Sequence, residues 1–238
     1  MKPVTRRDFV RDSVIAGTAA AAGTTAAASS QTESGTNQRH IKIVGISCSP
    51  RKGKTTAAGL QICLQAAQDV SSRIQTELIE LAGRRIDGSA AAGVTPEPGQ
   101  ADDFPALIPK LRDPSVAGII IGTPVYFASS SSLCKAFLER CISLWQDNFA
   151  LSNKVAGVLA VGGTRNGGQE LAIQSILPAL LCQEMIVVGN GRPQPRTGAT
   201  LWNSGADGIT KDEIGIATAK SLGRRVAEVA LKLNGITS

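Results

Sequence analysis

The chain has 238 residues, of which 42% are hydrophobic, 18% charged and 3% aromatic, and its formal net charge is +6. This length suits one domain with a full-sized hydrophobic core. Beyond the first residues there is no long run of Lys and Arg interleaved with aromatic residues, which is the pattern expected of a nucleic-acid-binding surface. We therefore expect no nucleic acid as a partner.

The first 30 residues predict an export signal. A twin arginine (Arg6, Arg7) precedes Phe9 and Arg11, and the uncharged stretch 14–28 ends in an A-x-A-like cleavage site. This stretch is too short and too weakly apolar for stable membrane insertion. The order T-R-R-x-F-V-R resembles a twin-arginine signal, which implies the twin-arginine export machinery as a partner and a periplasmic location. The alternative is a disordered basic tail.

Strand-like and helix-like segments alternate after a polar linker at 31–40. Strands are expected at 41–47, 73–81, 116–122, 154–162 and 184–189, and helices at about 55–70, 102–112, 131–147, 168–182 and 211–233. Two of the strands are almost continuously apolar, as strands covered on both faces must be. The pattern predicts an α/β domain over 41–238 with a doubly wound, five-stranded parallel sheet and helices on both faces. The segment 83–100, rich in Gly, Ala and Pro, is expected to be a long surface loop.

The segment ISCSPRKGKTT (46–56) joins the first strand to the first helix and favours phosphate binding. It ends like a nucleotide-triphosphate P-loop, but Cys48 stands where that motif has a glycine. The strands that follow end in IIIGTPVY and VLAVGGTR, without an acidic residue to hold Mg²⁺, which disfavours ATP hydrolysis. The first N–H groups of a helix attract anions. Hydroxyls and positive charges that suit a phosphate monoester are supplied by Ser47, Ser49, Thr55, Thr56, Arg51 and Lys54. A purely structural serine-rich turn is the alternative.

Three signatures resemble those of the flavodoxin-like NAD(P)H-dependent FMN reductases. The first is CSPRKGKTT, which is similar to their G-S-P-R-x-x-x-T loop. The second is GTPVYFASSSSLCKAFLER, which is similar to their G-[ST]-P-V-Y-F signature with its K-A-F-[IL]-[DE]-R ending. The third is GGTRNGGQE, which is similar to their third signature. The final helix is also similar, and the signatures occur in the family's order. The resemblance implies a flavodoxin-like fold, FMN as cofactor and NAD(P)H as cosubstrate.

The resemblance also assigns residues to parts of FMN. The loop with Ser47, Ser49, Arg51, Lys54, Thr55 and Thr56 would hold the phosphate. The isoalloxazine would lie along Pro124, Val125, Tyr126 and Phe127, and its other side would be closed by Gly162, Gly163, Thr164 and Gly168. Cys48 replaces the family's glycine, so the backbone is expected to approach the phosphate less closely there. As alternatives, Thr123-Pro124 would merely end a strand and the glycines would merely turn the chain.

Cysteine and histidine usage excludes several kinds of site. The five cysteines form no C-x-x-C pair, and the four at 63, 134, 141 and 182 lie in apolar helical patterns, which is typical of buried structural thiols. His40 is the sole histidine, so a histidine-dependent triad or zinc site is not expected. Related iron–sulfur flavoproteins carry clustered cysteines after the second strand, whereas segment 84–104 has none, so we expect no iron–sulfur cluster and no metal.

The function implied by the resemblance is an FMN-dependent NAD(P)H oxidoreductase. It would pass reducing equivalents through FMN to a quinone, a flavin or another small acceptor, with no catalytic acid or base required of the protein. The alternative is an exported FMN-binding electron-transfer protein that does not turn over nicotinamide.

A homo-oligomer is expected because family relatives commonly cover one another's flavin. Phe137 is spaced as a core residue, whereas Trp145 and Phe149 would form a patch beside the flavin loop. Trp202 lies in an irregular segment, and we expect residues 191–207 near the interface. The alternative is that these aromatic side chains cap the chain's own core.

Overall fold

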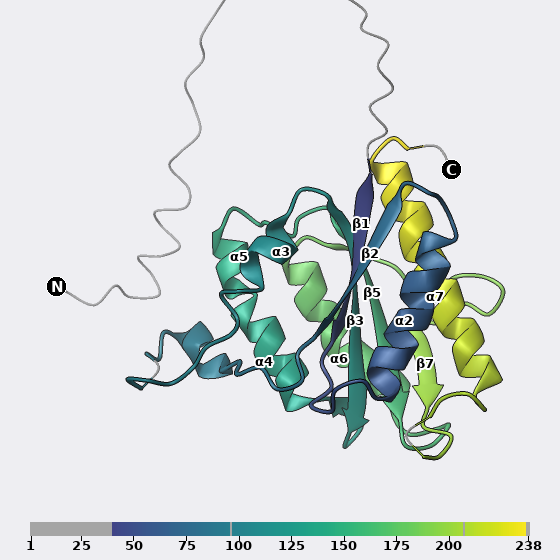
Figure 1. The fold of residues 1–238 in the computed structure, drawn as a ribbon, viewed down its shortest axis with the longest axis horizontal. Coiled ribbons are helices and arrows are strands. Elements are labelled where there is room, and N and C mark those ends of the chain that lie inside the picture. Colours follow the sequence, from purple (N-terminus) through teal and green to yellow (C-terminus); the bar gives the residue numbers. More distant parts are fainter. Residues whose placement is uncertain (1–39, 96, 207, 237–238) are drawn as a thin grey trace, which may run out of the picture. The chain divides into compact units, whose positions relative to one another are not determined.

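The computed structural model describes residues 40–95, 97–206 and 208–236 and has a seven-stranded sheet, in which five parallel strands lie in succession (Figure 1). The strands β1 (Ile41–Ser47), β2 (Ile74–Glu80), β3 (Val116–Tyr126), β5 (Val155–Gly162) and β6 (Ile186–Val187) lie in the order β2-β1-β3-β5-β6. All four pairings are parallel, as predicted. The predicted signal and all of the linker except His40 lie outside the described residues.

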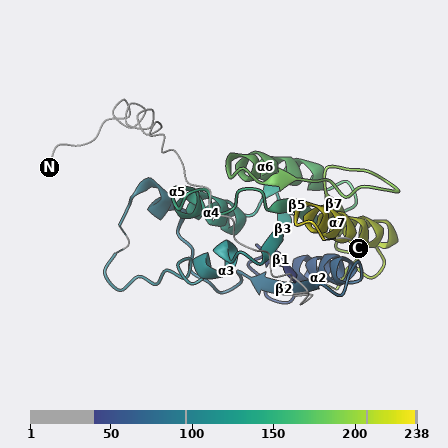
Figure 2. The ribbon, with the colours of Figure 1, turned by 90° about the horizontal axis from the view of Figure 1, so that it is seen from above.

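Helices cover both faces of the sheet, which confirms the doubly wound architecture (Figure 2). On one face lie α2 (Thr55–Gln68) and α7 (Glu213–Leu233); on the other lie α3 (Ile108–Arg112), α4 (Ser132–Arg140), α5 (Ile142–Gln146) and α6 (Gln169–Cys182). Successive strand side chains point to opposite faces. Ile43 therefore packs with the α2 and α7 side, and Val44 packs with the other side. No helix of the described chain is long and apolar enough to span a membrane.

The edge of the sheet is split: the strand predicted at 184–189 is present only as the two-residue β6, and a further edge strand was not predicted. β6 pairs with Val155–Ala156, and a further strand, β7 (Ala199–Trp202), pairs in parallel with residues 159–162 of β5. The residues between them form an excursion at 188–198. β7 is only four residues long and follows GRPQPRTG, whose Pro and Gly residues indicate a loop.

Two predicted helices and one predicted loop also differ from the structure. The segment 102–112 is helical only over α3, although Phe104 and Leu107 are buried, because an irregular turn containing Pro105 precedes the helix. The segment 131–147 divides at Cys141 into α4 and α5. The loop at 83–100 contains a short 3₁₀ helix, η1 (Gly88–Ala92).

An ion pair fastens the long loop to α4. Arg140 donates from Nη1 to Asp102 Oδ1 at 2.9 Å and from Nη2 to Oδ2 at 2.7 Å, and its guanidinium lies 4.9 Å from the centre of the Phe104 ring. The hydrogen bonds from Arg140 lower the pKa of the Asp102 carboxyl from its ordinary value. This two-point contact holds the end of the loop against the helix.

Candidate functional site

The three loops singled out in the sequence meet at the carboxyl ends of the strands. They are the first loop (48–54), the second loop (123–132) and the third loop (162–169). The strand order reverses between β1 and β3, which is where ligands bind in open α/β sheets. Ser131 Oγ, in the second loop, donates to Cys48 O in the first at 2.7 Å. A Cβ on Gly168, in the third loop, would lie 2.9 Å from Ala128 Cα in the second. The structure therefore brings the three predicted loops together.

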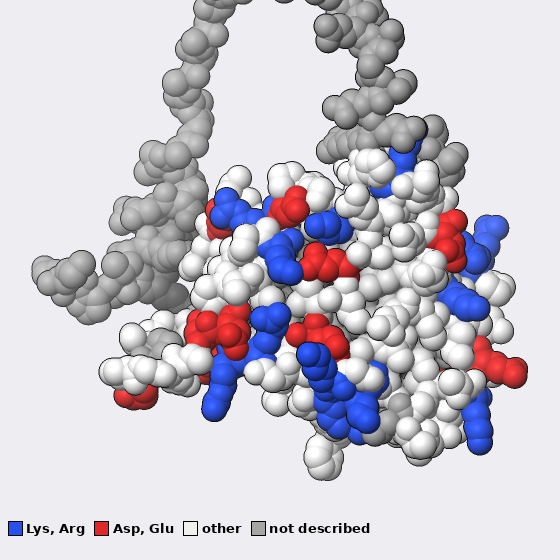
Figure 3. All heavy atoms as spheres, viewed as in Figure 1, with Lys and Arg blue, Asp and Glu red and all other residues white. Residues whose placement is uncertain are grey.

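The first loop, residues 48–54, has the features of an anion site. Helix α2 begins after Lys54, whose side chain does not cap it, and its first turn contains no acidic residue. The first N–H groups of a helix without a side-chain cap are available to a bound anion. Figure 3 shows Lys and Arg side chains gathered at the lower centre of the molecule, over the loop that leads into α2.

The hydroxyl groups predicted for this loop lie in its buried inner part. Ser49, Thr55 and Thr56 are each less than 5% exposed, and Ser49 Oγ accepts a hydrogen bond from Arg51 N at 3.1 Å. Ser47 Oγ is buried and has no hydrogen-bond partner among the described residues. An orphaned buried hydroxyl is rare in folded proteins, so it indicates a missing partner. The donor set therefore fits a phosphate monoester.

Glu80 touches this loop and was not singled out in the sequence. Its Oε2 accepts a hydrogen bond from Gly53 N at 2.7 Å. Glu80 is the last residue of β2 and is paired in register with Ser47, so its position at a carboxyl strand end is the signal that would have found it. The carboxylate orders the outer side of the loop and sets a negative charge beside the anion site.

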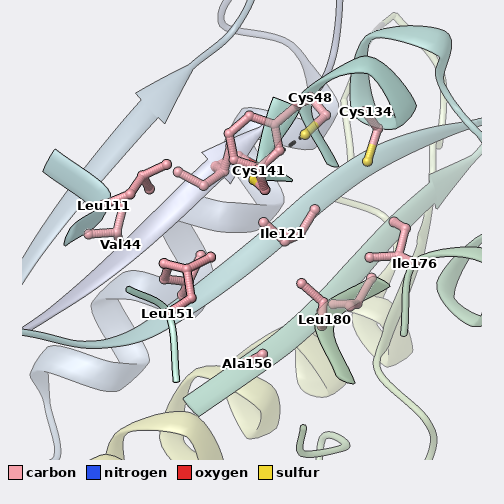
Figure 4. Packing of buried hydrophobic residues seen from close by; sticks show 14 of the residues in the cluster. Val44, Cys48, Leu111, Ile121, Cys134, Cys141, Leu151, Ala156, Ile176 and Leu180 are labelled. Carbon is pink, nitrogen blue, oxygen red and sulfur yellow. Dashed lines mark hydrogen bonds between the residues drawn. The ribbon is translucent and has the colours of Figure 1, made fainter. Parts of the chain in front are cut away.

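Cys48 points away from the anion site. Its side chain is fully buried in the core cluster that also holds Cys134 and Cys141 (Figure 4). Burial, and after it the neighbouring Cys134, raises the pKa of the Cys48 thiol well above its ordinary value. Cys48 is not among the residues with positive φ, so this position does not require glycine. The side chain that replaces the family's glycine therefore occupies core volume.

The second loop is a tight hairpin with two strained residues. β3 pairs with the short antiparallel strand β4 (Ser129–Ser130), and the turn residues Phe127 and Ala128 have φ of 49° and 59°. Hairpin turns with two positive φ values favour Gly and Asn, so other residues there are strained. Strain of this kind is concentrated at functional sites.

The four residues predicted to line the isoalloxazine differ in exposure. Pro124 is buried within β3 and Val125 is half-buried, whereas Tyr126 is 45% exposed and Phe127 is fully exposed. Full exposure of an aromatic side chain to water is unfavourable, and here it is combined with a strained turn. Tyr126 and Phe127 are thus the two side chains of the four that are available for contact with a ligand or partner.

Gln169 organises the third loop. Its Nε2 donates to Thr164 O at 2.6 Å and to Leu201 O at 3.0 Å, and its Oε1 accepts from Gly167 N at 2.8 Å. A Cβ on Gly162 would lie 2.5 Å from Gln169 Nε2, so the amide packs directly on that glycine. The sequence contained Gln169 within GGTRNGGQE but did not reveal this role.

The predicted residues of the third loop have different surroundings. Gly162 is buried and Gly168 has a φ of +87°, so both positions need glycine for structural reasons. Gly163 and Thr164 are exposed, and a Cβ on Gly163 would meet nothing within 4 Å. Among the described residues no group of three or more His, Cys, Asp and Glu is arranged to hold a metal.

This arrangement defines a flavodoxin-like α/β protein with a hydroxyl-rich loop and an uncapped helix start at the switch point of its sheet. Residues 41–193 match the model of the NADPH-dependent FMN reductase family. The chain belongs to that family and is accordingly an FMN-dependent oxidoreductase.

The relatives have names of two kinds. An iron–sulfur flavoprotein of Methanocaldococcus jannaschii is 37% identical over 192 residues, covering 79% of this chain and 97% of the relative. An NAD(P)H dehydrogenase (quinone) of Methylocella silvestris is 36% identical over 129 residues, covering 49% of this chain and 64% of the relative.

Solved structures show the same fold. RosB with bound 8-demethyl-8-formylriboflavin-5′-phosphate aligns with a TM-score of 0.61 at 19% identity, covering 82% of this chain and 81% of that one. The apo form of the NADH:FMN oxidoreductase EMOB aligns with a TM-score of 0.54 at 25% identity, covering 83% of this chain and 91% of that one.

Proposed function

We propose that the protein reduces a quinone, a flavin or another small acceptor with electrons from NAD(P)H, using FMN held at the three loops. The observation that carries this proposal is the uncapped start of α2, where buried hydroxyls converge and Ser47 Oγ has no hydrogen-bond partner in the part of the chain that the structure describes. The relatives named as NAD(P)H dehydrogenase (quinone) support the reaction class.

The residues divide between binding the phosphate and placing the ring. The phosphate would be held by Ser47, Ser49, Arg51, Lys54, Thr55, Thr56 and the first N–H groups of α2. The ring would lie between the Tyr126–Phe127 hairpin and the third loop, which Gln169 holds in shape. Bound FMN supplies the chemistry, which is acceptance of hydride from nicotinamide and release of electrons to the acceptor. The protein then positions both substrates, and no side chain of the site is required to move a proton.

Anaerobic reduction tests the reaction. The FMN-loaded protein is mixed with NADPH or NADH in the absence of oxygen, and its flavin absorbance is followed. Bleaching by one of the nucleotides, with recovery on adding a quinone, is the expected result. Flavin that is bleached by dithionite but by neither nucleotide would favour the alternative, an FMN-binding electron-transfer protein.

We propose that FMN is the sole redox centre. Relatives of this chain are named iron–sulfur flavoproteins, but segment 84–104 contains no cysteine. Cys48, Cys134 and Cys141 are buried in the core and serve packing. Iron and sulfide analysis of the anaerobically purified protein is expected to find neither in stoichiometric amounts, and about four of each per chain would overturn the proposal.

We also propose export by the twin-arginine route, supported by Arg6 and Arg7 and the uncharged stretch after them. Replacement of both arginines by lysine should keep the uncleaved protein in the cytoplasm. Mature protein in the periplasmic fraction of that variant would contradict the assignment.

We propose that the protein is at least a dimer in which a second copy covers the exposed hairpin. Phe137 is buried, as predicted, and Trp145 packs edge-on against Phe149 within the same chain, with ring centres 5.3 Å apart. Phe127 is fully exposed beside the FMN site and is therefore the aromatic side chain best placed for a partner. Light scattering of the FMN-loaded protein is expected to give at least a dimeric mass, and a monomeric mass at micromolar concentration would refute it.

A further inference from the structure

A hollow of about 470 Å³ adjoins the third loop. Its walls come from the third loop with the start of α6, from the excursion that splits the edge strand, and from the start of α7. The guanidinium groups of Arg165 and Arg196 line it together with the apolar side chains Leu171 and Ile214. Gly168 and Gln169 line the hollow and also belong to the third loop of the proposed FMN site, so the two lie next to each other.

Arg165 is held in place from behind. Asp212 is fully buried, caps α7 by accepting from Gly215 N at 2.8 Å, accepts from Trp202 N at 2.8 Å, and also accepts from Arg165 Nη2. The Arg165 guanidinium lies 5.9 Å from the centre of the Trp202 ring. An arginine anchored on one edge by a carboxylate and an aromatic ring still has N–H groups to offer a ligand.

Arg196 is placed by the backbone of the excursion. Asn190 is 1% exposed, and its Oδ1 accepts from Arg196 N at 2.6 Å while its Nδ2 donates to Gln194 O at 3.0 Å. Asn190 N also donates to Arg196 O at 3.2 Å. Three hydrogen bonds therefore close the excursion into a defined turn. The Arg196 side chain is 39% exposed and pairs with Glu170 at 3.5 Å, a surface pair of small energy.

The two arginines are close enough to affect each other. Partial burial, and after it the positive charge of Arg196, lowers the pKa of the Arg165 guanidinium from its ordinary value. Each guanidinium already has a carboxylate on one side, Asp212 for Arg165 and Glu170 for Arg196, so a phosphate in the hollow would take the N–H groups that these carboxylates leave over.

Apolar side chains at the hollow suit a flat ring. Leu171 is 56% exposed and Ile214 is 52% exposed, and both line this hollow. Exposed aliphatic side chains beside fixed charges match a ligand with a flat apolar part and a phosphate.

We propose that this hollow binds the 2′-phosphorylated adenosine of NADPH, with Arg165 and Arg196 on the phosphate and the adenine ring against Leu171 and Ile214. The inference rests on the proposed function, because the nicotinamide end of the same molecule must reach the flavin. Arginine forks match phosphate oxygens at two points, and an arginine near the ribose is a known means of accepting a 2′-phosphate. Arg196 lies beyond residues 41–193, the range that the family model matches.

The test compares Arg196→Ala with Arg192→Ala in the FMN-loaded full-length protein. Arg192 is an exposed arginine of the same excursion that does not line this hollow, so its loss makes the same charge change nearby. In Arg196→Ala, the ratio of KM for NADPH to KM for NADH should rise about 10- to 100-fold, the range for one charged hydrogen-bonding contact. Arg192→Ala should leave that ratio within about twofold. Equal ratios in the two variants would overturn the assignment.

Calorimetry with adenosine fragments separates this inference from the proposed function. Adenosine 2′,5′-bisphosphate should bind the wild type more tightly than 5′-AMP, and Arg196→Ala should remove that preference. If neither nucleotide reduces the flavin but this preference is present and depends on Arg196, the proposed function fails and the phosphate site stands. If NADPH reduces the flavin and the fragments bind equally, the site is wrong and the proposed function stands.

Discussion

The loop after β1 and the hairpin after β3 lie side by side but are built in opposite ways. The first buries its hydroxyls and holds Ser49, Thr55 and Thr56 almost wholly out of solvent. The hairpin holds Phe127 fully exposed on a backbone with positive φ. A rigid, preorganised loop suits tight binding of a group that stays, and an exposed, strained turn suits contact with molecules that come and go. The cofactor's phosphate and the mobile substrates are thus assigned to different loops.

Charge reversal at Arg51 tests the binding role of the first loop. Arg51→Glu puts a negative charge beside the phosphate, and FMN affinity should fall by about 2–3 kcal/mol, roughly 30- to 150-fold, the range for a hydrogen bond to a charged group. Fluorescence titration of the apoprotein with FMN measures it. Lys220→Glu makes the same charge change at an exposed position of α7 and should leave affinity within about twofold. Similar losses in both variants would show that net charge, and not this loop, governs binding.

A pair of glycine substitutions tests the contact between the hairpin and the third loop. In Gly168→Ala the new Cβ would lie 2.9 Å from Ala128 Cα at a φ of +87°, so we expect a loss of about 1–3 kcal/mol in the free energy of unfolding. FMN affinity should fall with it because the hairpin must move. Gly163→Ala meets nothing within 4 Å and serves as the control for the free energy of unfolding. Urea denaturation and FMN titration measure both effects, and equal stability of the two variants would contradict the packing described.

Cys48→Ala tests whether the side chain at position 48 serves core packing or contacts the phosphate. Removing a fully buried sulfur should lower the free energy of unfolding by about 1 kcal/mol. FMN affinity should stay within about twofold, because the side chain faces Cys134 and Cys141. A large loss of affinity without a loss of stability would place this side chain against the phosphate instead.

Phe127→Gly tests the role of the hairpin and is the substitution with the smallest expected effect on stability. Glycine accepts a φ of 49° without strain, so the free energy of unfolding should change by less than about 1 kcal/mol, in the stabilising direction if at all. Turnover with NAD(P)H and quinone should nonetheless fall, because the exposed ring beside the flavin is lost. Unchanged steady-state kinetics would remove Phe127 from the site.

The sequence predicted the features that depend on local residue patterns. It did not predict the features that depend on tertiary contacts. Four strands and the start of α2 follow from apolar runs and hydroxyl-rich turns that need no knowledge of neighbours. The split of the edge strand was not predictable, because β7 is a four-residue strand that depends on pairing with β5. Glu80 and Gln169 act through partners that are 27 and up to 32 residues away, a relation that periodicity does not record. The outward direction of Phe127 likewise depends on the turn geometry and not on residue type.

Comparison of FMN with riboflavin tests the central claim most directly. The two ligands share the isoalloxazine and the ribityl chain and differ by the phosphate that the first loop is assigned to hold. Titration of the apoprotein should show FMN binding at one per chain and riboflavin binding at least about 100-fold more weakly, since several charge-assisted hydrogen bonds are lost. Equal affinity for the two ligands would contradict the account.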